Sequence, residues 1–325
     1  MVGVDVGGTK VLAAAVAEDG THGPTVQVPM PGRSVEVELL EQCLTQAVEV
    51  AAEGRRVQAV GLSAAGFVDA AGETVAFAPH LPWRGDPVRA RLAHRWGVPV
   101  SLENDATCAV VAEATHGAAR DRDSVVLVTL GTGIGGGLVA HGQVVRGAGG
   151  MAGEYGHMTV DWDGRPCECG GRGCWEQYCS GRALLREVRR RWGSVPSRLG
   201  EHCSGDPSAL TGPAVTAAAE QGDELALAAF TVVGQWLGRG LANLVAAVDP
   251  ELVVVGGGVS DAGELLLEPA RRELASVLVG AAHRTVPPVV RAETGRAAGL
   301  VGAAVLARSL LVRPQQGPHG VGAPD

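Results

Sequence analysis

A strand–glycine–strand pattern that occurs twice is the feature that most constrains how this chain folds. Each occurrence consists of two apolar runs separated by glycines: residues 2–6 and 11–17 around Gly7-Gly8, and residues 125–130 and 138–140 around the glycine-rich segment 131–137. A glycine turn between two such runs predicts a β-hairpin, because glycine adopts the backbone angles that tight turns need. Two hairpins roughly 125 residues apart predict two related half-domains rather than a solenoid.

The rest of the chain alternates strand and helix patterns, which predicts an α/β fold. Apolar residues at helical spacing predict a helix over residues 38–53, with Gly54 in the position of a C-cap. Further strands are expected at 57–62, 98–102 and 252–255, and further helices from Ala106 and at 182–191, 214–221, 224–248 and 297–311. The strand at 252–255 leads into a third glycine junction, and the last helix is expected to pack on the N-terminal half.

The chain length predicts more than one domain. With 325 residues, the chain exceeds what one hydrophobic core usually fills, so we expect two domains that share a cleft. The small domain is expected to span residues 1–112, completed by the helix at 297–311, and the large domain residues 113–296. Residues 312–325 are rich in Pro, Gly and Gln and are expected to form a disordered tail.

Composition and charge exclude several classes of protein. The formal net charge of −8 argues against a nucleic-acid partner, which requires a basic face. No apolar run reaches the ~18 residues that cross a bilayer, because Asp249, Pro250 and Glu251 interrupt the best stretch, so no membrane partner is expected. The N-terminus enters a strand pattern without a cleavable apolar segment, which predicts a cytoplasmic protein with reduced cysteines.

The glycine-rich segments admit more than one interpretation. Gly131, Gly133 and Gly136 match the spacing of a dinucleotide-binding fingerprint, but the residues after them favour a returning strand over the helix that the fingerprint requires. A glycine hairpin can instead direct successive backbone N–H groups at a phosphate, although a single such hairpin is more often a plain turn. Two hairpins that face each other would clamp a triphosphate.

Two charged residues accompany the first hairpin. Asp5 ends the first strand, where a carboxylate can position Mg²⁺ through water; the alternative is an aspartate that only stabilises the turn. Lys10 belongs to no Walker motif, so it is not interpreted as a Walker lysine, and a simply exposed side chain is the alternative.

A cluster of metal-ligand residues in one loop is the strongest single signal. It combines one imidazole with three thiols: His157, Cys167, Cys169 and Cys174. These are ligand types that zinc prefers, and a closed set of four protein ligands predicts a structural zinc site rather than a catalytic one. Cys179 is an alternative ligand. The remaining three cysteines are expected to be buried small hydrophobes: Cys43, Cys108 and Cys203.

Together these motifs resemble the ROK family (repressors, open reading frames and kinases), especially its bacterial glucokinases. The resemblance extends from residue 2 to about residue 311 and rests on segments 5–10, 103–106, 130–137, 154–157 and 167–176. The cysteine-containing signature is specific to this family, whereas the glycine motifs are shared with a wider superfamily. The resemblance implies an actin-like (ribonuclease H-like) ATPase fold with two domains around a cleft.

The resemblance also implies the role of individual residues in ATP-dependent phosphorylation of glucose to glucose 6-phosphate. Asp105 would be the general base. The sugar-binding residues would be Gly66, Asn104, Asp105, Glu154, His157 and Glu176, with His157 also a zinc ligand. ATP, accompanied by Mg²⁺, would be bound by Asp5, Gly7, Gly8, Thr9, Lys10, Thr132, Gly133, Gly256, Gly257 and Gly258. A homodimer or homotetramer is implied as well.

Several alternatives stay open on the sequence alone. The sugar is glucose or a related hexose, with fructose, mannose, N-acetylglucosamine and N-acetylmannosamine as other candidates, and polyphosphate is an alternative phosphoryl donor. A sugar-responsive transcriptional regulator is a different class of function, but the chain carries no winged-helix segment before its first phosphate motif. A sugar-binding protein without catalysis is disfavoured, because every expected catalytic residue is present.

Overall fold

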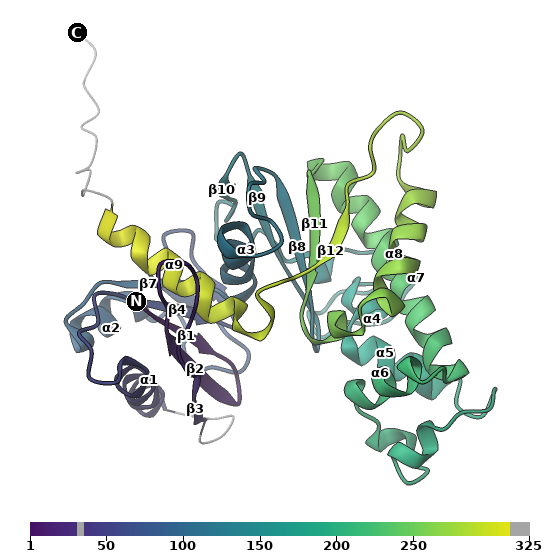
Figure 1. The fold of residues 1–325 in the computed structure, drawn as a ribbon, viewed down its shortest axis with the longest axis horizontal. Coiled ribbons are helices and arrows are strands. Elements are labelled where there is room, and N and C mark those ends of the chain that lie inside the picture. Colours follow the sequence, from purple (N-terminus) through teal and green to yellow (C-terminus); the bar gives the residue numbers. More distant parts are fainter. Residues whose placement is uncertain (31–35, 313–325) are drawn as a thin grey trace. The chain divides into compact units, whose positions relative to one another are not determined.

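The computed structural model describes residues 1–30 and 36–312, which form two compact units (Figure 1). Unit 1 comprises Met1–Thr115, Ala148–Gly150 and the chain from Ala297 onward, and unit 2 comprises His116–Gly147 and Met151–Arg296. Of the tail expected at residues 312–325, all but the first residue lies outside the described residues.

Unit 1 is built around a five-stranded sheet in the order β3-β2-β1-β4-β7. Its strands are β1 (Val2–Val6), β2 (Lys10–Ala15), β3 (Val26–Pro29), β4 (Val60–Ala64) and β7 (Val100–Asn104), and a separate ribbon contains β5 (Phe67–Val68) and β6 (Val75–Phe77). Its helices are α1 (Val37–Ala52), α2 (Val88–Trp96), α3 (Asp105–His116) and α9 (Ala298–Val312). β1 pairs antiparallel with β2, so the predicted N-terminal hairpin is confirmed.

Unit 2 contains a second five-stranded sheet, in the order β10-β9-β8-β11-β12. Its strands are β8 (Val125–Leu130), β9 (Ile134–Ala140), β10 (Gln143–Val144), β11 (Leu252–Gly256) and β12 (Val289–Arg291). Its α-helices are α4 (Glu176–Cys179), α5 (Gly181–Arg190), α6 (Gly212–Glu220), α7 (Glu224–Val248) and α8 (Glu264–Val277). Short 3₁₀ helices lie at Tyr155–His157, Leu199–His202, Pro207–Ala209, Gly258–Ala262 and Gly295–Ala297.

The two sheets follow one plan. In each, a central strand (β1 or β8) pairs antiparallel with the next strand in the chain, which pairs antiparallel with an edge strand. On its other side the central strand pairs parallel with β4 or β11, and that strand pairs parallel with β7 or β12. The prediction of two related half-domains is therefore confirmed at the level of topology.

Helix α9 packs directly on the sheet of unit 1, against β1, β4 and β7. Glycine makes this approach close, because a Cβ atom on Gly61 in β4 would lie 1.9 Å from the Ala303 carbonyl oxygen. On its other contact, with α3, a Cβ on Gly302 would lie 1.8 Å from the Cys108 carbonyl oxygen. Only glycine fits at such separations, because real Cβ atoms do not approach within 3.0 Å. The last helix thus packs on the N-terminal sheet, as predicted.

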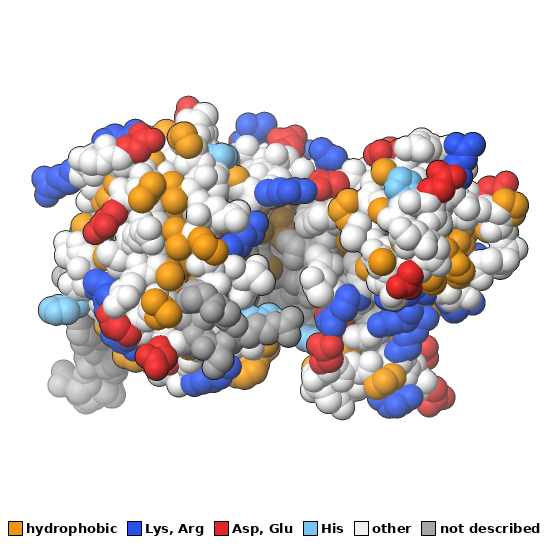
Figure 2. Space-filling model, turned by 90° about the horizontal axis from the view of Figure 1, so that it is seen from below, with side chains coloured by type: hydrophobic (Ala, Val, Ile, Leu, Met, Phe, Trp, Pro, Cys, Tyr) orange, Lys and Arg blue, Asp and Glu red, His pale blue; other side chains and the backbone are white. Residues whose placement is uncertain are grey.

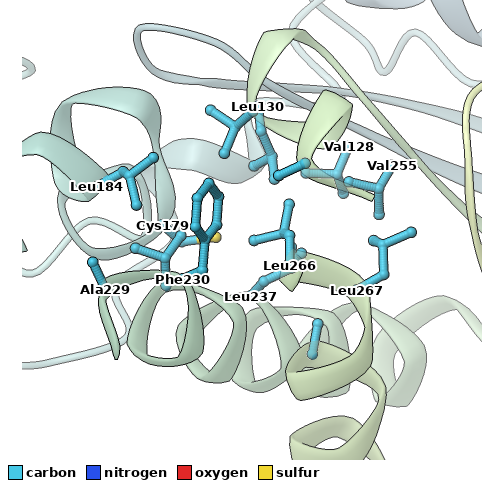
Figure 3. Close-up of a cluster of buried hydrophobic side chains, with 14 of the residues drawn as sticks. Val128, Leu130, Cys179, Leu184, Ala229, Phe230, Leu237, Val255, Leu266 and Leu267 are labelled. Carbon is cyan, nitrogen blue, oxygen red and sulfur yellow. The ribbon is translucent and has the colours of Figure 1, made fainter. Parts of the chain in front are cut away.

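The core of unit 2 lies between its sheet and helices α5, α7 and α8 (Figure 3). Leu130 and Val255 from the sheet, Phe230 from α7 and Leu266 from α8 are each at most 1% exposed. Burial of side chains of this size contributes about 1.5–3 kcal/mol each, which is why the helix pair α7 and α8 stays on this face of the sheet.

Helix α7 corrects the expectation that no apolar segment reaches the length of a membrane span. Asp249 falls just after the end of α7, so the helix itself is long and apolar enough by length and composition. However, 61% of its most apolar window is buried inside the protein. This burial is typical of a core helix, and one such helix is weak evidence for a span.

Several predicted boundaries differ from the observed ones. The strand expected at 57–62 is β4, shifted toward the C-terminus because its neighbours in the register, Val2 and Val100, begin there. The strand expected at 98–102 shifts in the same way, and the helix after it begins at Asp105 rather than Ala106. At the end of α1 the left-handed C-cap is Glu53 rather than Gly54.

The glycine run at 135–137 lies inside strand β9, as the predicted returning strand requires. A Cβ on Gly136 would lie 2.1 Å from Tyr155 Cδ2 and 2.8 Å from the Gly153 carbonyl oxygen. These glycines therefore let the loop that precedes the metal-ligand cluster pack against the sheet, and the turn itself consists of residues 131–133.

Candidate functional site

The carboxyl end of β7 presents an asparagine and an aspartate at the start of α3. Asn104 caps this helix, because its Oδ1 accepts hydrogen bonds from the backbone N–H groups of Ala106 (2.9 Å) and Thr107 (3.1 Å). Its Nδ2 donates to the Gly66 carbonyl oxygen at 3.0 Å. Asp105 is exposed, and its Oδ1 accepts from the Ala106 N–H at 2.8 Å. Three of the residues predicted to bind sugar therefore lie together in unit 1: Gly66, Asn104 and Asp105.

Asp5 lies on β1, which β4 separates from β7 in the sheet, and it is paired with Ser63 on β4. The Ser63 hydroxyl donates to Asp5 Oδ1 at 2.6 Å. Burial raises the pKa of Asp5, while the Ser63 hydrogen bond and the charge of Lys10 oppose this rise. Gly299, near the start of α9, leaves room for the carboxyl group, since a Cβ there would lie 2.8 Å from Asp5 Oδ1.

The first glycine hairpin closes through a hydrogen bond from the Gly7 N–H to the Lys10 carbonyl oxygen at 3.1 Å. Its tip, Gly8, lies against His80, because a Cβ on Gly8 would lie 2.6 Å from His80 Cβ. Thr9 and Lys10 are exposed, and Lys10 is the only lysine in the sequence. The hairpin thus presents backbone N–H groups and one ammonium group at the edge of unit 1.

The second hairpin turn is anchored to helix α5 in unit 2. The Gly131 N–H donates to the Gly133 carbonyl oxygen (3.0 Å), the Gly181 N–H donates to the Gly131 carbonyl oxygen (2.8 Å), and Arg182 Nε donates to the Thr132 carbonyl oxygen (3.2 Å). Gly133 lies against Glu176, whose Oε2 would be 2.4 Å from a Cβ on that glycine. The turn and the start of α4 are therefore one packed structure.

The third glycine junction, at the end of β11, lies beside the second hairpin. Gly256 ends the strand, Gly257 has a φ of 81°, and Gly258 begins a 3₁₀ helix. A Cβ on Gly257 would lie 2.5 Å from the Leu130 carbonyl oxygen. Two of the predicted nucleotide segments therefore meet in unit 2, at the carboxyl ends of the adjacent parallel strands β8 and β11.

The other predicted sugar-binding residues lie together in unit 2. The Glu154 carboxylate is 3.9 Å from His157 Nε2. Burial raises the pKa of Glu154, and the charge of Glu176 adds to this effect while His157 opposes it. Glu176 is 8% exposed, and its Oε1 accepts from Cys167 Sγ at 3.3 Å and from Gln177 Nε2 at 3.4 Å. Two carboxylates and an imidazole thus lie next to the cysteine loop.

The four predicted metal ligands form one cluster in which all ligand atoms lie within 4.8 Å of one another. His157 Nδ1 is 3.8 Å from Cys167 Sγ, and Cys169 Sγ is 3.6 Å from Cys174 Sγ. Ligand bonds of about 2.0–2.3 Å in a tetrahedron place neighbouring ligand atoms at about such separations. The residues present therefore fit a zinc ion.

The thiols of the cluster differ in their environment. Burial raises the pKa of Cys167 and of Cys174, the latter to about 12. By contrast, the N–H group of Gly171 donates to Cys169 and lowers its pKa. Because zinc binds thiolates, metal binding would release protons from this loop.

The remaining cysteines lie outside the cluster. Cys179, the alternative ligand, is fully buried in the core of unit 2 near Phe230 (Figure 3). Cys108 and Cys203 are buried, and Cys43 is half-buried against the core of unit 1. Sequence reasoning missed Ser63 and His80. No local sequence pattern pointed to either residue, because Ser63 meets Asp5 through the pairing of β1 with β4, and His80 lies far in the sequence from Gly8.

Comparison with known proteins establishes the family. The ROK family model matches residues 1–309. The chain belongs to the ROK family. Among ROK proteins it is similar to the glucokinase of Streptomyces coelicolor, with 42% identity over 313 residues, covering 94% of this chain and 97% of that protein. It is also similar to the glucokinase of Thermotoga maritima, with 35% identity over 305 residues, covering 94% of this chain and 96% of that protein.

A solved structure of a ROK protein shares the whole fold. The ROK family glucokinase from Streptomyces griseus in complex with glucose and AMPPNP is 42% identical to this chain, with a TM-score of 0.86, and the match covers 95% of this chain and 99% of that one. The predicted actin-like α/β fold of this ROK protein is thereby confirmed.

Proposed function

We propose that this ROK protein phosphorylates glucose to glucose 6-phosphate with ATP as the donor. The observation that carries the proposal is the likeness, along almost the entire chain, to the Streptomyces griseus glucokinase with bound glucose and AMPPNP. The residues that the reaction requires are present in both units. Phosphoryl transfer needs a base for the attacking hydroxyl, groups that orient the sugar, and positive charge or N–H groups around the phosphates.

Asp105 is the proposed general base, which takes the proton from the 6-hydroxyl of the sugar as that oxygen attacks the γ-phosphorus. The bond from the γ-phosphorus to the β,γ-bridging oxygen breaks in the same step, and ADP leaves. The hydrogen bond from the Ala106 N–H to its Oδ1 fixes the carboxylate at the start of α3. Asn104 is held between that helix and Gly66, so the asparagine and the aspartate keep a fixed relation to each other. Fixed geometry of this kind is what general base catalysis needs.

Glu154, His157 and Glu176 are proposed to bind the sugar hydroxyl groups. Carboxylates accept hydrogen bonds from two hydroxyls each, which suits a polyol whose buried groups must all be satisfied. His157 would bind zinc through Nδ1, which faces Cys167. Its Nε2 would then carry a proton and donate on the side of Glu154.

Zinc, when bound, would fix the loop from His157 to Cys174 and would take no part in the transfer. Its ligands would be His157, Cys167, Cys169 and Cys174, which fit it in type and spacing. Glu176 follows Cys174 by two residues, so the rigidity of this loop determines where the Glu176 carboxylate lies. The residues themselves orient the sugar.

The glycine segments are proposed to bind ATP with its Mg²⁺. The phosphates would contact the first hairpin (Gly7, Gly8, Thr9 and Lys10) and the second (Thr132 and Gly133), and the adenosine would lie near Gly256, Gly257 and Gly258. Asp5 would hold water molecules of the magnesium ion, as carboxylates near phosphates commonly do. Lys10 adds a mobile positive charge at the first hairpin.

A cytoplasmic location and a homodimeric or homotetrameric state complete the proposal. The oligomeric state is what the family resemblance implies, and gel filtration with light scattering measures it directly.

A coupled assay over a hexose panel tests the proposed activity. Glucose, mannose, fructose, N-acetylglucosamine and N-acetylmannosamine are each supplied with ATP or with polyphosphate, and zinc is quantified in the same preparation. We expect the highest kcat/KM for glucose with ATP and about one zinc per chain. A higher kcat/KM for another sugar or for polyphosphate would reassign the substrate, and no turnover with any pair would reject the kinase proposal.

A further inference from the structure

Two arginine side chains, Arg165 and Arg186, converge on the carbonyl oxygen of Gln177 at the base of the cysteine loop, and a third, Arg182, lies close enough to Arg186 for their charges to interact. Arg165 Nη1 and Arg186 Nη1 both donate to this oxygen at 2.8 Å. Arg182 lies one turn before Arg186 on α5, on the same face of the helix. We refer to Arg165, Arg182 and Arg186 as the arginine triad. Figure 2 shows arginine side chains, in blue, gathered on the surface of unit 2.

The positive charge of the triad is only partly neutralised. Within residues 1–30 and 36–312, neither Arg165 nor Arg186 forms an ion pair with a carboxylate; their partners are a carbonyl oxygen, the Gln177 amide oxygen and an aromatic ring. Arg182 pairs with Glu168 at 2.7 Å, but Glu168 is 79% exposed. Exposed pairs contribute little free energy, so an anion can replace Glu168 easily.

The three guanidinium groups act on one another electrostatically. Burial lowers the pKa of Arg186, and the charges of Arg165 and Arg182 lower it further. Like charges held together in this way are stabilised when an anion binds between them, because guanidinium groups offer paired N–H donors to an oxyanion. The folded protein already holds these charges together, so anion binding does not have to overcome their repulsion.

The triad rests on a fixed support. The Arg165 guanidinium lies over the Tyr178 ring, 4.9 Å from its centroid. The Tyr178 hydroxyl donates to Asp161 Oδ2 and accepts from the Arg165 N–H, both at 2.9 Å. Arg186 is held at a second point, because its Nη2 donates to Gln177 Oε1 at 3.2 Å. Arg165 and Arg186 are therefore positioned before any ligand arrives.

We propose that the arginine triad is a binding site for a small anion that carries more than one phosphate group. This site goes beyond the proposed function, which uses none of the three residues. The triad is too small to follow a nucleic acid backbone, and the net charge of −8 opposes binding to an extended polyanion. The phosphate groups of a compact bisphosphate present tetrahedral oxygens that match the guanidinium donors.

The site is connected to the second glycine hairpin. Arg182 Nε donates to the Thr132 carbonyl oxygen as well as pairing with Glu168. An anion that draws the Arg182 side chain away from Glu168 and toward Arg165 and Arg186 changes the support of this hairpin. By reciprocity, any effect of the anion on nucleotide affinity must equal the effect of nucleotide on anion affinity.

Isothermal titration calorimetry at low ionic strength tests the proposal on the full chain with its metal. Fructose 1,6-bisphosphate and inorganic phosphate are titrated separately into protein saturated with glucose and AMPPNP, so that the proposed substrate sites are filled. We expect one saturable site that binds the bisphosphate more tightly than inorganic phosphate and weakens as sodium chloride is added. Arg165→Gln and Arg186→Gln should each weaken binding about tenfold or more.

Arg239→Gln is the matched control. Arg239 lies over Trp236, the ring that packs against Tyr178, but it pairs with Glu273 outside the triad. It should bind the anion as the wild type does. If Arg186→Gln fails to fold, Arg165→Gln carries the test.

Three results would overturn the proposal. They are absence of binding, equal binding by all variants, and binding that disappears when AMPPNP is present. A failure of the proposed function is separate: it would show as no binding of glucose or AMPPNP, and the anion titration would then be run without them.

Discussion

The Gly133→Ala variant tests whether the Glu176 carboxylate binds the sugar. The new Cβ atom would lie 2.4 Å from Glu176 Oε2, whereas ordinary contacts begin at 3.4 Å. The carboxylate must therefore move by about 1 Å. It has little room to do so, because Glu176 is 8% exposed and holds hydrogen bonds from Cys167 and Gln177.

A displacement of this size removes a hydrogen bond from sugar to carboxylate. Hydrogen bonds to charged groups contribute about 1.5–3 kcal/mol, which corresponds to about a 10- to 150-fold weaker affinity for glucose. Gly133 keeps its backbone N–H group in the variant, so the KM for ATP should change far less. The stability of the fold should fall only slightly, because the displaced atom is the end of a side chain.

Two measurements separate the effect on glucose from the effect on ATP. Steady-state kinetics with each substrate varied in turn gives the two KM values, and a glucose titration followed by tryptophan fluorescence gives the affinity for glucose. Gly131→Ala is the matched control in the same turn, since a Cβ on Gly131 has no atom within 4 Å. It should leave glucose affinity unchanged. If Gly133→Ala instead raises the KM for ATP and leaves glucose affinity intact, Glu176 does not bind the sugar and the reasoning is refuted.

Three further predictions concern the metal, the first hairpin and Asp5. The Cys169→Ser variant should lose bound zinc and have a lower melting temperature, whereas the Cys43→Ser variant, altered outside the cluster, should keep its zinc. Elemental analysis and thermal denaturation measure these two properties, and a Cys169→Ser variant with its full zinc content would contradict the predicted zinc site. An amine-directed reagent should modify Lys10, the only lysine in the sequence, and ATP should slow that reaction several-fold if the first hairpin binds phosphate. Mass spectrometry follows the labelling, and a labelling rate that ATP does not change argues against phosphate binding by this hairpin. Because burial raises the pKa of Asp5 in the folded protein, its contribution to stability is complete below the ordinary pKa of 3.8 and is lost as pH rises through the folded value. Asp5→Asn, which keeps an acceptor for Ser63, should therefore lack this loss and melt no lower than wild type at neutral pH, while its turnover falls; a variant that melts well below wild type there would contradict the electrostatic argument.

Much of the fold could be predicted from periodicity and glycine. Helix α7 was expected at 224–248 and is observed as Glu224–Val248, where the Asp223 side chain caps the first turn by accepting from the Ala226 N–H. The first hairpin and β8 were also predicted correctly. These elements were predicted correctly because the residues that specify them lie within the elements or next to them in the sequence.

Other elements depend on contacts that sequence patterns do not encode. Helix α8 was not predicted, since Pro269 lies inside it, although that proline packs against Gly234 of α7. The returning strand at the glycines 135–137 was predicted, but nothing local shows that Tyr155 packs on Gly136. In α8, tertiary packing overrides the local preference.

The metal cluster illustrates what residue types alone can predict. The four ligands lie close together as expected, because their chemistry and their spacing within one loop already restricted the arrangement. In contrast, the partnership of Asp5 with Ser63 depends on the parallel register of β1 and β4. Strand register is set by the whole sheet, so this contact could not be deduced from either segment.

Turnover and glucose binding of Asp105→Asn, measured together, test the central claim most directly. The variant keeps an oxygen that can accept from the Ala106 N–H but loses the carboxylate that takes the hydroxyl proton. We predict that glucose affinity stays close to the wild-type value while kcat falls by about 10²- to 10⁴-fold, the usual contribution of a general base. A kcat close to that of the wild type would contradict the assignment of Asp105 as the base.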